Sequence, residues 1–501
     1  MRGSLSLIST LIMILFTASL QARIIHVPSD SSTIQGGING AVDGDTVMVL
    51  PGTYYEHDID FLGKAIVVTG TAPDDSAVVA ATVVDADSSG RVFIFHSGED
   101  TTSILSGLSV TNGLADTGGG IYCTNSSPLI SHCMITRNST YYAGGGINCE
   151  NSSPNISKNL IVGNSVDFGD GGGISCGYSS NPLIYNNIIN GNSAGAGGGI
   201  YIHAQSSPIV NNNIIAYNQS IDVVPPHFAA GAGISVGLAS ATIINNTITQ
   251  NYSSNYGGGI YLQQNNNTIV VNTILWGNSA PLGPEIALRD FSGPGATLTI
   301  SYSDVEGGQG SVYMESMSTL YWGQGMIDSD PLFADSGYHL QSNSPCIDTG
   351  DPSILDACLP PGLSEDRSDM GAYGGEENCG WPVIVPGVDL SLYPTGPTTV
   401  PIGEFLDFHT YIFNNMDRTV SGDYWLSVQL PNSTEFLIPE ILLNYSNPLS
   451  GQIQPFGSVD LDNWLFIPGR ADTGSYRLIG RIGDYPDTIT DEESFEFQVV
   501  E

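Results

Sequence analysis

Apolar and polar residues alternate in short runs along this chain, and one such run recurs through its middle. Each copy begins with a glycine-rich triplet and an isoleucine, and a second apolar residue or cysteine lies two positions later. The isoleucines are Ile121, Ile147, Ile174, Ile200, Ile234 and Ile260, so the steps are 26, 27, 26, 34 and 26 residues. A two-residue alternation is that of a β-strand, so the pattern predicts a short strand in every copy.

A second set of landmarks follows each isoleucine. The copies continue with Ser-Ser-Pro or a related phrase, a short apolar run and an asparagine, and these asparagines are Asn138, Asn164, Asn192, Asn218, Asn251 and Asn278. A single copy cannot bury its apolar side, whereas stacked copies can, because each strand then pairs with its counterparts about 4.8 Å above and below. The sequence therefore predicts a parallel β-helix with an inward isoleucine column and an asparagine ladder at a bend.

Cysteines occupy part of the next inward column. Cys123, Cys149 and Cys176 stand two residues after an isoleucine, where later copies have Ile202, Val236 and Leu262. We interpret these three cysteines as small buried apolar residues. Seven cysteines leave at least one unpaired within the chain. Cys358 and Cys379 bracket a loop of irregular composition and are predicted to form a disulfide.

The repeated phrase also carries a family resemblance. Glycine-glycine-X-isoleucine with a following asparagine resembles the right-handed parallel β-helix repeats of the pectin-lyase-like superfamily, in particular the polymorphic outer-membrane protein type of bacterial surface proteins. The phrases SPCIDTGDP at 344–352 and DRSDMGAYGG at 366–375 resemble the C-terminal end of secreted bacterial β-helix proteins, where this element terminates the solenoid. The superfamily contains lyases, hydrolases and adhesins, so the resemblance implies the fold and leaves the activity open.

The chain divides into an all-β solenoid and a second all-β region. Residues 1–22 have Arg2, an apolar run and a small residue at Ala22, which predicts a signal peptide and hence a secreted protein. Residues 23–380 are predicted to form the right-handed parallel β-helix, with about a dozen coils at the repeat length. A linker at 381–387 precedes 388–501, whose longer alternating strands predict an immunoglobulin-like β-sandwich.

The start of the solenoid departs from the repeat. Ser31 or Ser32 is expected to cap a short helix with Ile34, Ile38 and Val42 on one side, and this helix would cover the open end of the first coil. Residues 78–84 are expected to form a strand of an early, less regular coil. After the signal peptide, no stretch is long and apolar enough to span a membrane.

Charge restricts the partners of this protein. Twelve basic residues stand against 50 acidic ones, a net charge of −38. Such a charge argues against nucleic acid and anionic membrane surfaces. Neutral polysaccharides, cell-surface glycans or partners bridged by Ca²⁺ fit better. Weak Ca²⁺ candidates are Asp328, Asp330, Asp348 and Asp351, although turn and capping roles are the simpler interpretation.

A functional site is expected where the sequence varies most from copy to copy. This is the turn between the ladder asparagine and the next glycine triplet. Stacking would align these turns along one edge. The predicted binding strip consists of Tyr141, Tyr142, Phe168, Phe228, Tyr252 and Tyr256, with the carboxylates and imidazole of Asp116, Asp167, Asp170, Asp222 and His227 beside it. Aromatic faces and carboxylates in a row suit a sugar polymer. The alternative is that these are ordinary solvated turn residues.

A second surface is the outward side of the strand that follows the triplet. Its residues are Tyr122, Glu150, Tyr201, His203, Tyr261 and Gln263. Stacking between neighbouring strands is a sufficient reason for their presence, and ligand binding is the alternative.

Three functions remain open. The first is a secreted, non-catalytic protein that binds carbohydrate along one edge of the solenoid. The second is a polysaccharide lyase or glycoside hydrolase, for which Asp116, Asp167, Asp170, Asp222 and His227 are the catalytic candidates. The chain lacks the NTD, DD, GHG and RIK blocks of polygalacturonases, so those catalytic residues cannot be transferred. The third is a structural spacer of the cell envelope.

Overall fold

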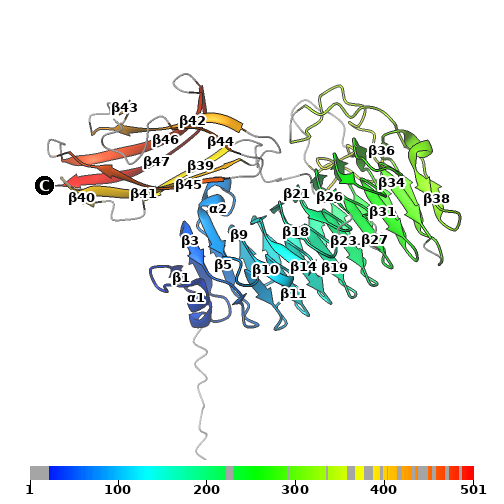
Figure 1. The fold of residues 1–501 in the computed structure, drawn as a ribbon, viewed down its shortest axis with the longest axis horizontal. Helices are drawn as coiled ribbons and strands as arrows, with labels where there is room; N and C mark the ends of the chain where they lie inside the picture. Colours follow the sequence, from blue (N-terminus) through cyan, green and yellow to red (C-terminus); the bar gives the residue numbers. More distant parts are fainter. Residues whose placement is uncertain are drawn as a thin grey trace, which may run out of the picture.

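A computed structural model of the chain shows a long parallel β-solenoid and a separate group of C-terminal strands (Figure 1). The structure describes residues 22–221, 229–290, 293–334, 337–357, 367–376, 378, 388–394, 399–402, 404–414, 420–431, 435–437, 449–453, 458–468, 473–484 and 488–500. The solenoid has about 11 turns, which confirms the predicted all-β parallel β-helix. Within the described residues, no helix is long and apolar enough to cross a membrane.

Three long parallel sheets form the walls of the solenoid, and we name them A, B and C. Sheet A contains β1 (Ile24–Val27), β2 (Thr46–Val49), β5 (Val67–Gly70), β8 (Ile104–Ser106), β12 (Leu129–Ser131), β16 (Asn155–Ser157), β20 (Leu183–Tyr185), β24 (Ile209–Asn211), β28 (Thr242–Ile244), β32 (Asn267–Val271), β35 (Thr297–Ser301) and β38 (Thr319–Trp322). Sheet B contains β3 (Gly52–Tyr55), β6 (Thr82–Asp85), β9 (Ser109–Thr111), β13 (Met134–Thr136), β17 (Leu160–Val162), β21 (Ile188–Asn190), β25 (Ile214–Ala216), β29 (Thr247–Thr249), β33 (Ile274–Trp276) and β36 (Asp304–Val305). Sheet C contains β4 (Ile59–Asp60), β7 (Phe93–Phe95), β11 (Ile121–Thr124), β15 (Ile147–Glu150), β19 (Ile174–Gly177), β23 (Ile200–His203), β27 (Ile234–Gly237), β31 (Ile260–Gln263), β34 (Ile286–Arg289) and β37 (Tyr313–Met314).

A fourth sheet, D, occupies the segments that the sequence predicted to be variable turns. Its strands are β10 (Leu114–Thr117), β14 (Ser139–Ala143), β18 (Ser165–Val166), β22 (Ser193–Ala194), β26 (Gln219–Ser220) and β30 (Tyr252–Ser253). Each coil of this region therefore runs from sheet C to A, B and D before it returns to C. The turn prediction was wrong here because backbone pairing between coils needs no apolar pattern in the side chains.

The core is built from residues one coil apart, as the repeat predicts. Ile121 pairs with Ile147 and Cys123 with Cys149, and the same register continues to Ile260. These residues belong to one continuous buried cluster. Cys123, Cys149 and Cys176 are fully buried free thiols in this column, which confirms their apolar role.

The asparagine ladder is present at the bend between sheets B and D. Asn192 Nδ2 donates to Asn218 Oδ1 at 3.0 Å and to the carbonyl of Ile161 at 2.9 Å. The same contacts recur from Asn138 to Asn278. A second ladder, absent from our prediction, consists of Asn159, Asn187, Asn213 and Asn246 between sheets A and B. Buried amides thus hold the coils in register at both bends.

Two short helices lie near the N-terminal end. The helix α1 (Ile34–Gly40) is capped by Thr33, whose side chain accepts from Gly36 N, and not by the predicted Ser31 or Ser32. Ile34 and Ile38 are buried, whereas Val42 lies beyond the helix and is exposed. A second helix, α2 (Ser76–Ala81), replaces the first half of the strand expected at 78–84. Asp75 caps it by accepting from Ala77 N and Val78 N, a start signal that the sequence prediction missed.

The C-terminal element of the solenoid, which we call the strap, comprises 344–357 and 367–376. It packs on the flank of sheet B, whereas the resemblance implied an element that terminates the solenoid. Asn245 Nδ2 donates to the Asp369 carbonyl at 3.0 Å, and Asn212 Nδ2 donates to the Ala372 carbonyl at 2.8 Å. Met370 is buried against Ile274 of β33. The strap therefore covers outward side chains of three successive coils.

The strands after 388 form two sheets. One contains β39 (Val388–Pro394), β41 (Phe405–Asn414) and β45 (Ser458–Phe466); the other contains β40 (Thr399–Pro401), β47 (Thr488–Val500), β46 (Gly474–Asp484), β42 (Val420–Gln429) and β43 (Glu435–Leu437), with β44 (Leu449–Ile453) beside β42. Pairing is antiparallel except between β40 and β47. Helix α2 contacts β39 (Figure 1).

The immunoglobulin-like assignment of the C-terminal strands and the predicted domain boundaries remain predictions. Cys358 and Cys379 lie outside the described residues, and no disulfide occurs within those residues.

Candidate functional site

The structure brings together part of the predicted strip. The rings of Tyr141 and Phe168 stack at a centroid distance of 6.5 Å and an interplanar angle of 11°, and both rings are exposed. Tyr142 is exposed beside them on β14. Phe168 N donates to the Tyr141 carbonyl at 3.0 Å, so backbone pairing between coils sets this arrangement. Tyr141 and Phe168 form a small aromatic platform at the edge of sheet D, and Tyr142 is the next residue of β14.

Other members of the predicted strip lie apart from this platform. Tyr252 is exposed on β30, and the strands β22 and β26 between it and the platform carry no aromatic residue. Tyr256 packs instead on the outer side of sheet C, where the Arg289 guanidinium lies 4.2 Å from its ring centroid and Tyr313 lies 5.8 Å away. Asp222, His227 and Phe228 lie outside the described residues.

The predicted carboxylates differ in their surroundings. Asp116 and Asp167 are exposed. Asp170 is partly buried, and its Oδ1 accepts from Ala196 N at 2.9 Å. Burial and the neighbouring Asp170 carboxylate raise the pKa of Tyr201. The Asp170 carboxylate therefore accepts a hydrogen bond from the backbone of the next coil and lies beside Tyr201 on the outer side of sheet C.

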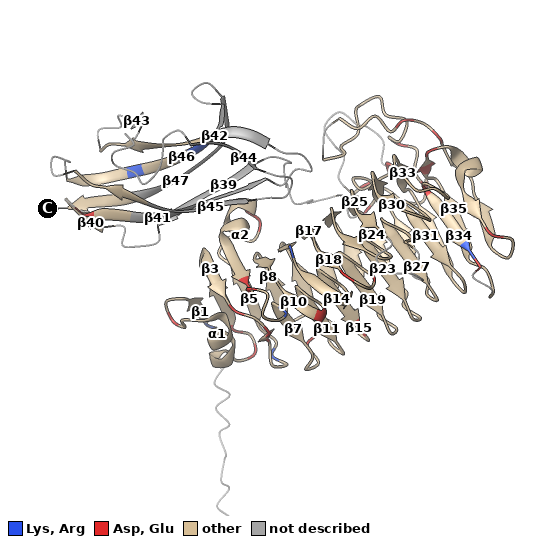
Figure 2. Ribbon diagram, viewed as in Figure 1, with Lys and Arg blue, Asp and Glu red and all other residues tan. Residues whose placement is uncertain are grey.

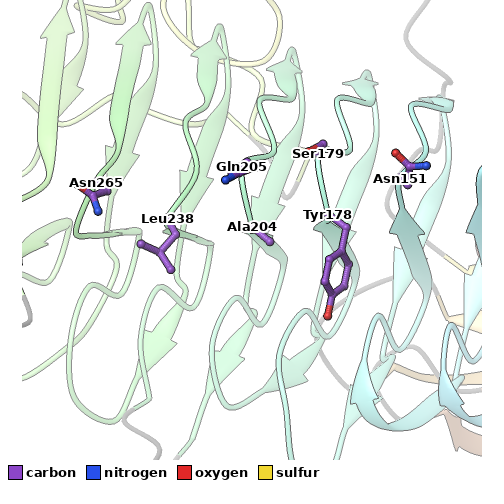
Figure 3. Close-up of a pocket in the computed structure, with 7 residues that line it drawn as sticks. All are labelled: Asn151, Tyr178, Ser179, Ala204, Gln205, Leu238 and Asn265. Atoms are coloured by element: carbon purple, nitrogen blue, oxygen red, sulfur yellow. The ribbon is translucent and has the colours of Figure 1, made fainter.

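A groove lies on a different edge, at the turns that join sheet C to sheet A (Figure 3). Its volume is about 700 Å³. We call it the turn groove, and its lining residues are Asn151, Tyr178, Ser179, Ala204, Gln205, Leu238 and Asn265. They come from five successive coils, and Tyr178 and Leu238 are 60% and 48% exposed. None of the lining residues is charged.

The turns that line the groove share a left-handed backbone conformation with other bends of the solenoid, such as those at His132, Arg137 and Lys158. Tyr178, Ala204 and Leu238 have positive φ values of 54°, 51° and 54°. Asn151 and Asn265, at the corresponding place in other coils, have 51° and 54°. Asparagine adopts this left-handed conformation readily, whereas Tyr, Ala and Leu do so at a cost of about 1–2 kcal/mol. The conformation belongs to the bends of the solenoid in general, and at the groove it carries the exposed side chains of Tyr178 and Leu238.

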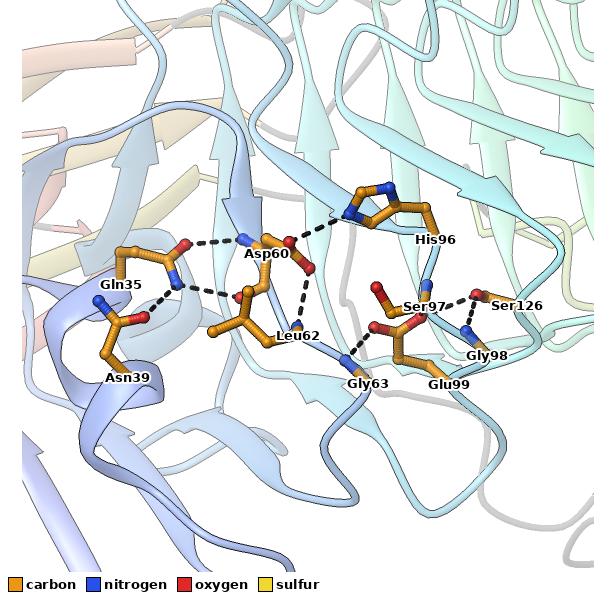
Figure 4. Close-up of polar contacts among 10 residues, drawn as sticks. All are labelled: Gln35, Asn39, Asp60, Leu62, Gly63, His96, Ser97, Gly98, Glu99 and Ser126. Atoms are coloured by element: carbon orange, nitrogen blue, oxygen red, sulfur yellow. Dashed lines mark hydrogen bonds and ion pairs between the residues drawn. The ribbon is translucent and has the colours of Figure 1, made fainter.

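Buried serines hold these turns in register beneath the groove. Ser152 N donates to Ser180 Oγ, and Ser180 N donates to Ser206 Oγ, each at 3.1 Å. The row begins at Ser126, whose Oγ donates to Glu99 Oε2 at 2.8 Å. Glu99 is buried and also accepts from Gly63 N at 2.8 Å (Figure 4). Hydrogen bonding thus fixes the floor of the groove independently of any ligand.

A polar cluster on the outer side of sheet C adjoins the groove through Tyr178. The His203 ring lies edge-on to Tyr178 at 5.6 Å and stacks on Tyr201 at 4.9 Å. A Cβ at Gly177 would lie 2.2 Å from His203 Nε2, so only glycine admits this position of the ring. Burial lowers the pKa of His203, and the charge of Glu150 opposes the shift.

Glu150 is held by its own neighbours. Its carboxylate accepts from Tyr122 Oη at 2.8 Å and from Asn148 Nδ2 at 3.0 Å. These contacts orient Glu150 beside Asn151 at one end of the groove. The carboxylate and the imidazole can take part in hydrogen bonding with a ligand or in proton transfer. Stacking between strands, the structural interpretation of the sequence analysis, accounts for their observed contacts.

The four aspartates named as weak Ca²⁺ candidates take part in hydrogen bonds that stabilise turns. Asp328 Oδ1 accepts from Gly307 N at 3.0 Å, Asp330 Oδ1 accepts from Leu332 N at 2.9 Å, and Asp351 Oδ1 accepts from Ser353 N at 2.9 Å. Asp348 N donates to Asp369 Oδ1 at 2.8 Å. Among the described residues, no group of three or more His, Cys, Asp or Glu side chains could hold a metal ion. Calcium binding stays a prediction.

The turn groove was missed in the sequence because its residues immediately precede the Ser-Ser-Pro phrase or its equivalent, which we took only as a landmark. A signal was present nonetheless. The residue before this phrase is asparagine in some copies, such as Asn125 and Asn151, but Tyr178 or Leu238 in the corresponding part of others. A repeat position that holds a turn residue in some copies and a large apolar residue in others lies on the surface, where the core does not determine the side chain.

Comparisons with known proteins agree with the fold. Residues 75–248 match the family model described as "Right handed beta helix region". The fold and this match together define the chain as a right-handed β-helix repeat protein. No curated protein matches the chain.

Solved structures give only weak similarity. An alkylpurine DNA glycosylase, AlkC, from Pseudomonas fluorescens is 9% identical with a TM-score of 0.19. The CARDB domain of a Pyrococcus furiosus protein is 18% identical with a TM-score of 0.17, and a β-glucosidase mutant from Listeria innocua is 15% identical with a TM-score of 0.18. Each match covers 23% of this chain, and it spans 30%, 90% and 16% of those chains, respectively. Similarity at this level carries no functional argument.

Proposed function

We propose that this protein is a secreted, non-catalytic β-helix protein that binds an extended, neutral carbohydrate polymer in the turn groove. The observation that carries the proposal is the groove itself, an open concavity across five coils with uncharged lining residues. Secretion rests on the signal peptide predicted for residues 1–22.

The chemistry of the lining suits a neutral sugar. The exposed ring of Tyr178 and the side chain of Leu238 offer apolar surface to the C–H groups of a pyranose ring. Asn151, Gln205 and Asn265 supply amides that donate to and accept from hydroxyl groups. A polyanion would gain no cationic partner from the lining, and the net charge of −38 would repel it.

The geometry of the groove suits a polymer. Its lining residues repeat once per coil, and adjacent coils are about 4.8 Å apart. The sugar units of an extended β-linked glycan repeat at a spacing close to this value, so successive units meet equivalent turns. The groove is fixed before binding by the buried serine row, which reduces the entropic cost of association.

The proposal is tested with the mature chain and a panel of neutral and uronic polysaccharides, with and without Ca²⁺. Binding is followed by isothermal titration calorimetry, and turnover by absorbance at 235 nm and by reducing ends. We expect neutral polymers to bind without product formation. Product formation would support the lyase or hydrolase alternative. Absence of binding to every polymer would support a structural spacer.

A further inference from the structure

A column of outward positions on sheet C follows the turn groove along its length. It contains Glu150, Gly177, His203, Gly237 and Gln263, one from each of the successive strands β15, β19, β23, β27 and β31. Each of these residues precedes a lining residue of the groove by one or two positions. Polar side chains and glycines alternate in the column, so a polar side chain recurs at every second coil. We call Glu150, His203 and Gln263 the polar column.

The two glycines determine how the neighbouring side chains lie. A Cβ at Gly177 would overlap the His203 imidazole, and a Cβ at Gly237 would lie 3.2 Å from Gln263 Oε1. The His203 ring and the Gln263 amide therefore each lie over the glycine of the preceding coil. Because both side chains lean in the same direction, their spacing stays at two ladder steps, or about 9.6 Å.

The polar column has unused hydrogen-bonding groups beside the groove. Within the part of the chain that the structure describes, the His203 ring and the Gln263 amide form no hydrogen bond, and both side chains are half-buried. Glu150 accepts one hydrogen bond at each carboxylate oxygen, from Tyr122 and from Asn148, and keeps further lone pairs on both oxygens. These groups are therefore available to hydroxyl groups of a ligand in the groove.

Charge restricts the ligand that this column can bind. Figure 2 shows that Lys and Arg are sparse along the strands of the solenoid. The charged member of the polar column is the carboxylate of Glu150, which accepts from a hydroxyl group and repels a uronate. The column thus favours a neutral sugar, in agreement with the uncharged lining of the groove.

We infer that the polymer bound in the turn groove is a β-1,4-linked glycan, and that the polar column forms hydrogen bonds with hydroxyl groups of every second sugar unit. This inference rests on the proposed function and names its ligand class. In a ribbon-like β-1,4-linked glycan each unit is rotated by half a turn relative to the one before it. The same edge of the sugar therefore faces the column at every second unit, as the polar side chains do at every second coil. Glycans that coil, such as α-1,4-linked or β-1,3-linked glucans, cannot follow this straight column.

Calorimetry with neutral glucose oligosaccharides that differ only in linkage tests the inference. We expect the mature chain to bind the β-1,4-linked pentasaccharide at least about tenfold more tightly than the α-1,4-linked and β-1,3-linked pentasaccharides. Within the β-1,4-linked series, affinity should rise most at the trisaccharide and at the pentasaccharide. These lengths reach a second and a third member of the polar column, whereas the tetrasaccharide reaches no new one.

A variant of the last member of the column separates ligand contact from a structural role. Gln263→Ala should raise the dissociation constant of the pentasaccharide about fivefold, because one hydrogen bond is lost. It should change that of the trisaccharide by no more than about twofold, since this ligand still spans Glu150 and His203. The matched control Gln219→Ala, on exposed β26 of sheet D, should change neither constant by more than about twofold. Circular dichroism confirms that both variants fold.

The possible results distinguish this inference from the proposed function. Equal affinity for the three linkages, or affinity that rises evenly with each added unit, would overturn the inference and leave the proposed function intact. The same holds if Gln263→Ala leaves pentasaccharide binding unchanged or weakens the two lengths alike. If no neutral polysaccharide or oligosaccharide binds, the proposed function and the inference are both overturned.

Discussion

Single residues in the turn groove combine a costly backbone with an exposed side chain. Leu238 has a φ of 54° and is half exposed, whereas asparagine occupies the comparable position in other coils. The cost is local to the turn. Replacing such a residue by asparagine should therefore improve stability and impair binding together.

Leu238→Asn is expected to raise the free energy of unfolding by about 1 kcal/mol, since asparagine tolerates the left-handed conformation. Urea denaturation measures the change, and calorimetry should show weaker binding of a neutral polysaccharide. The matched control is Leu183→Asn, an exposed leucine of β20 that is absent from the positive-φ residues. It should give no gain in stability; an equal gain in both variants would refute the strain argument.

Glu285 shows how one carboxyl group closes a ladder of amides. Asn278 N donates to Glu285 Oε1 at 3.0 Å, so this buried side chain takes the place of the next asparagine. Burial raises the pKa of Glu285 to about 8 from its ordinary value of 4.5. The folded state therefore holds a proton that the unfolded state releases between these two values, and stability falls as pH rises from about 4.5 to about 8.

Glu285→Gln is expected to remove this pH dependence. At pH 5 the variant and the wild-type chain should have nearly equal stability, because the carboxyl group is largely protonated in the folded state. At pH 9 the variant should be more stable by an amount on the order of a few kcal/mol. Thermal denaturation at several pH values measures the difference. A variant that is less stable than the wild type at pH 9 would contradict this account.

At the scale of elements, the sequence predicted those features that repeat and missed those that do not. The ladder from Asn138 to Asn278 was predicted because its spacing follows the repeat. The second ladder through Asn187 was missed, since asparagine also occurs in turns there. The helix α2 was missed because Asp75 caps a sequence rich in valine and alanine, which is compatible with a strand as well. Sheet D was missed because its strands pair through backbone hydrogen bonds, and its side chains show no alternating apolar pattern that would predict a strand.

The asparagine ladder is expected to be a major stabilising element. Asn192→Ala removes an amide that donates to Asn218 Oδ1 and Ile161 O and accepts from Asn164, so several buried groups lose partners. The cost should be about 3 kcal/mol. Asn181→Ala, at an exposed turn, should cost less than about 1 kcal/mol. Chemical denaturation compares the two, and equal effects would show that the ladder adds nothing specific.

The strap should respond to pH. Burial raises the pKa of Asp369 to about 7 and that of Asp356 to about 6, from ordinary values near 3.8. Both groups stabilise the packed strap when protonated, so this stability is complete below about 3.8 and is lost as pH rises through 6 and 7. Hydrogen exchange of 367–376, corrected for the intrinsic rate, should show more opening at pH 8 than at pH 5. Asp369→Asn should reduce the difference, and a strap that opens more at pH 5 would contradict the prediction.

At the scale of the whole molecule, the repeat determined the architecture and left the position of the site open. The period of about 26 residues predicted stacked coils, and the register of Ile121 with Ile147 confirms it. The predicted binding strip followed the most variable turns; among its described residues, Tyr141 and Phe168 stack on each other, and Tyr142 is next to Tyr141 on β14. Period alone does not show which edge of a coil is concave. That depends on the course of each turn in space and on the side chains that line it, such as those of Tyr178 and Leu238.

The most direct test of the proposed function compares these two edges. Binding of the tightest neutral polysaccharide from the panel is measured by calorimetry for the wild-type chain, for Tyr178→Ala in the turn groove, and for Tyr141→Ala combined with Phe168→Ala on sheet D. The account predicts a dissociation constant at least about tenfold higher for Tyr178→Ala, and a change below about twofold for the double variant. The opposite ranking would contradict it and place binding on the sheet D platform.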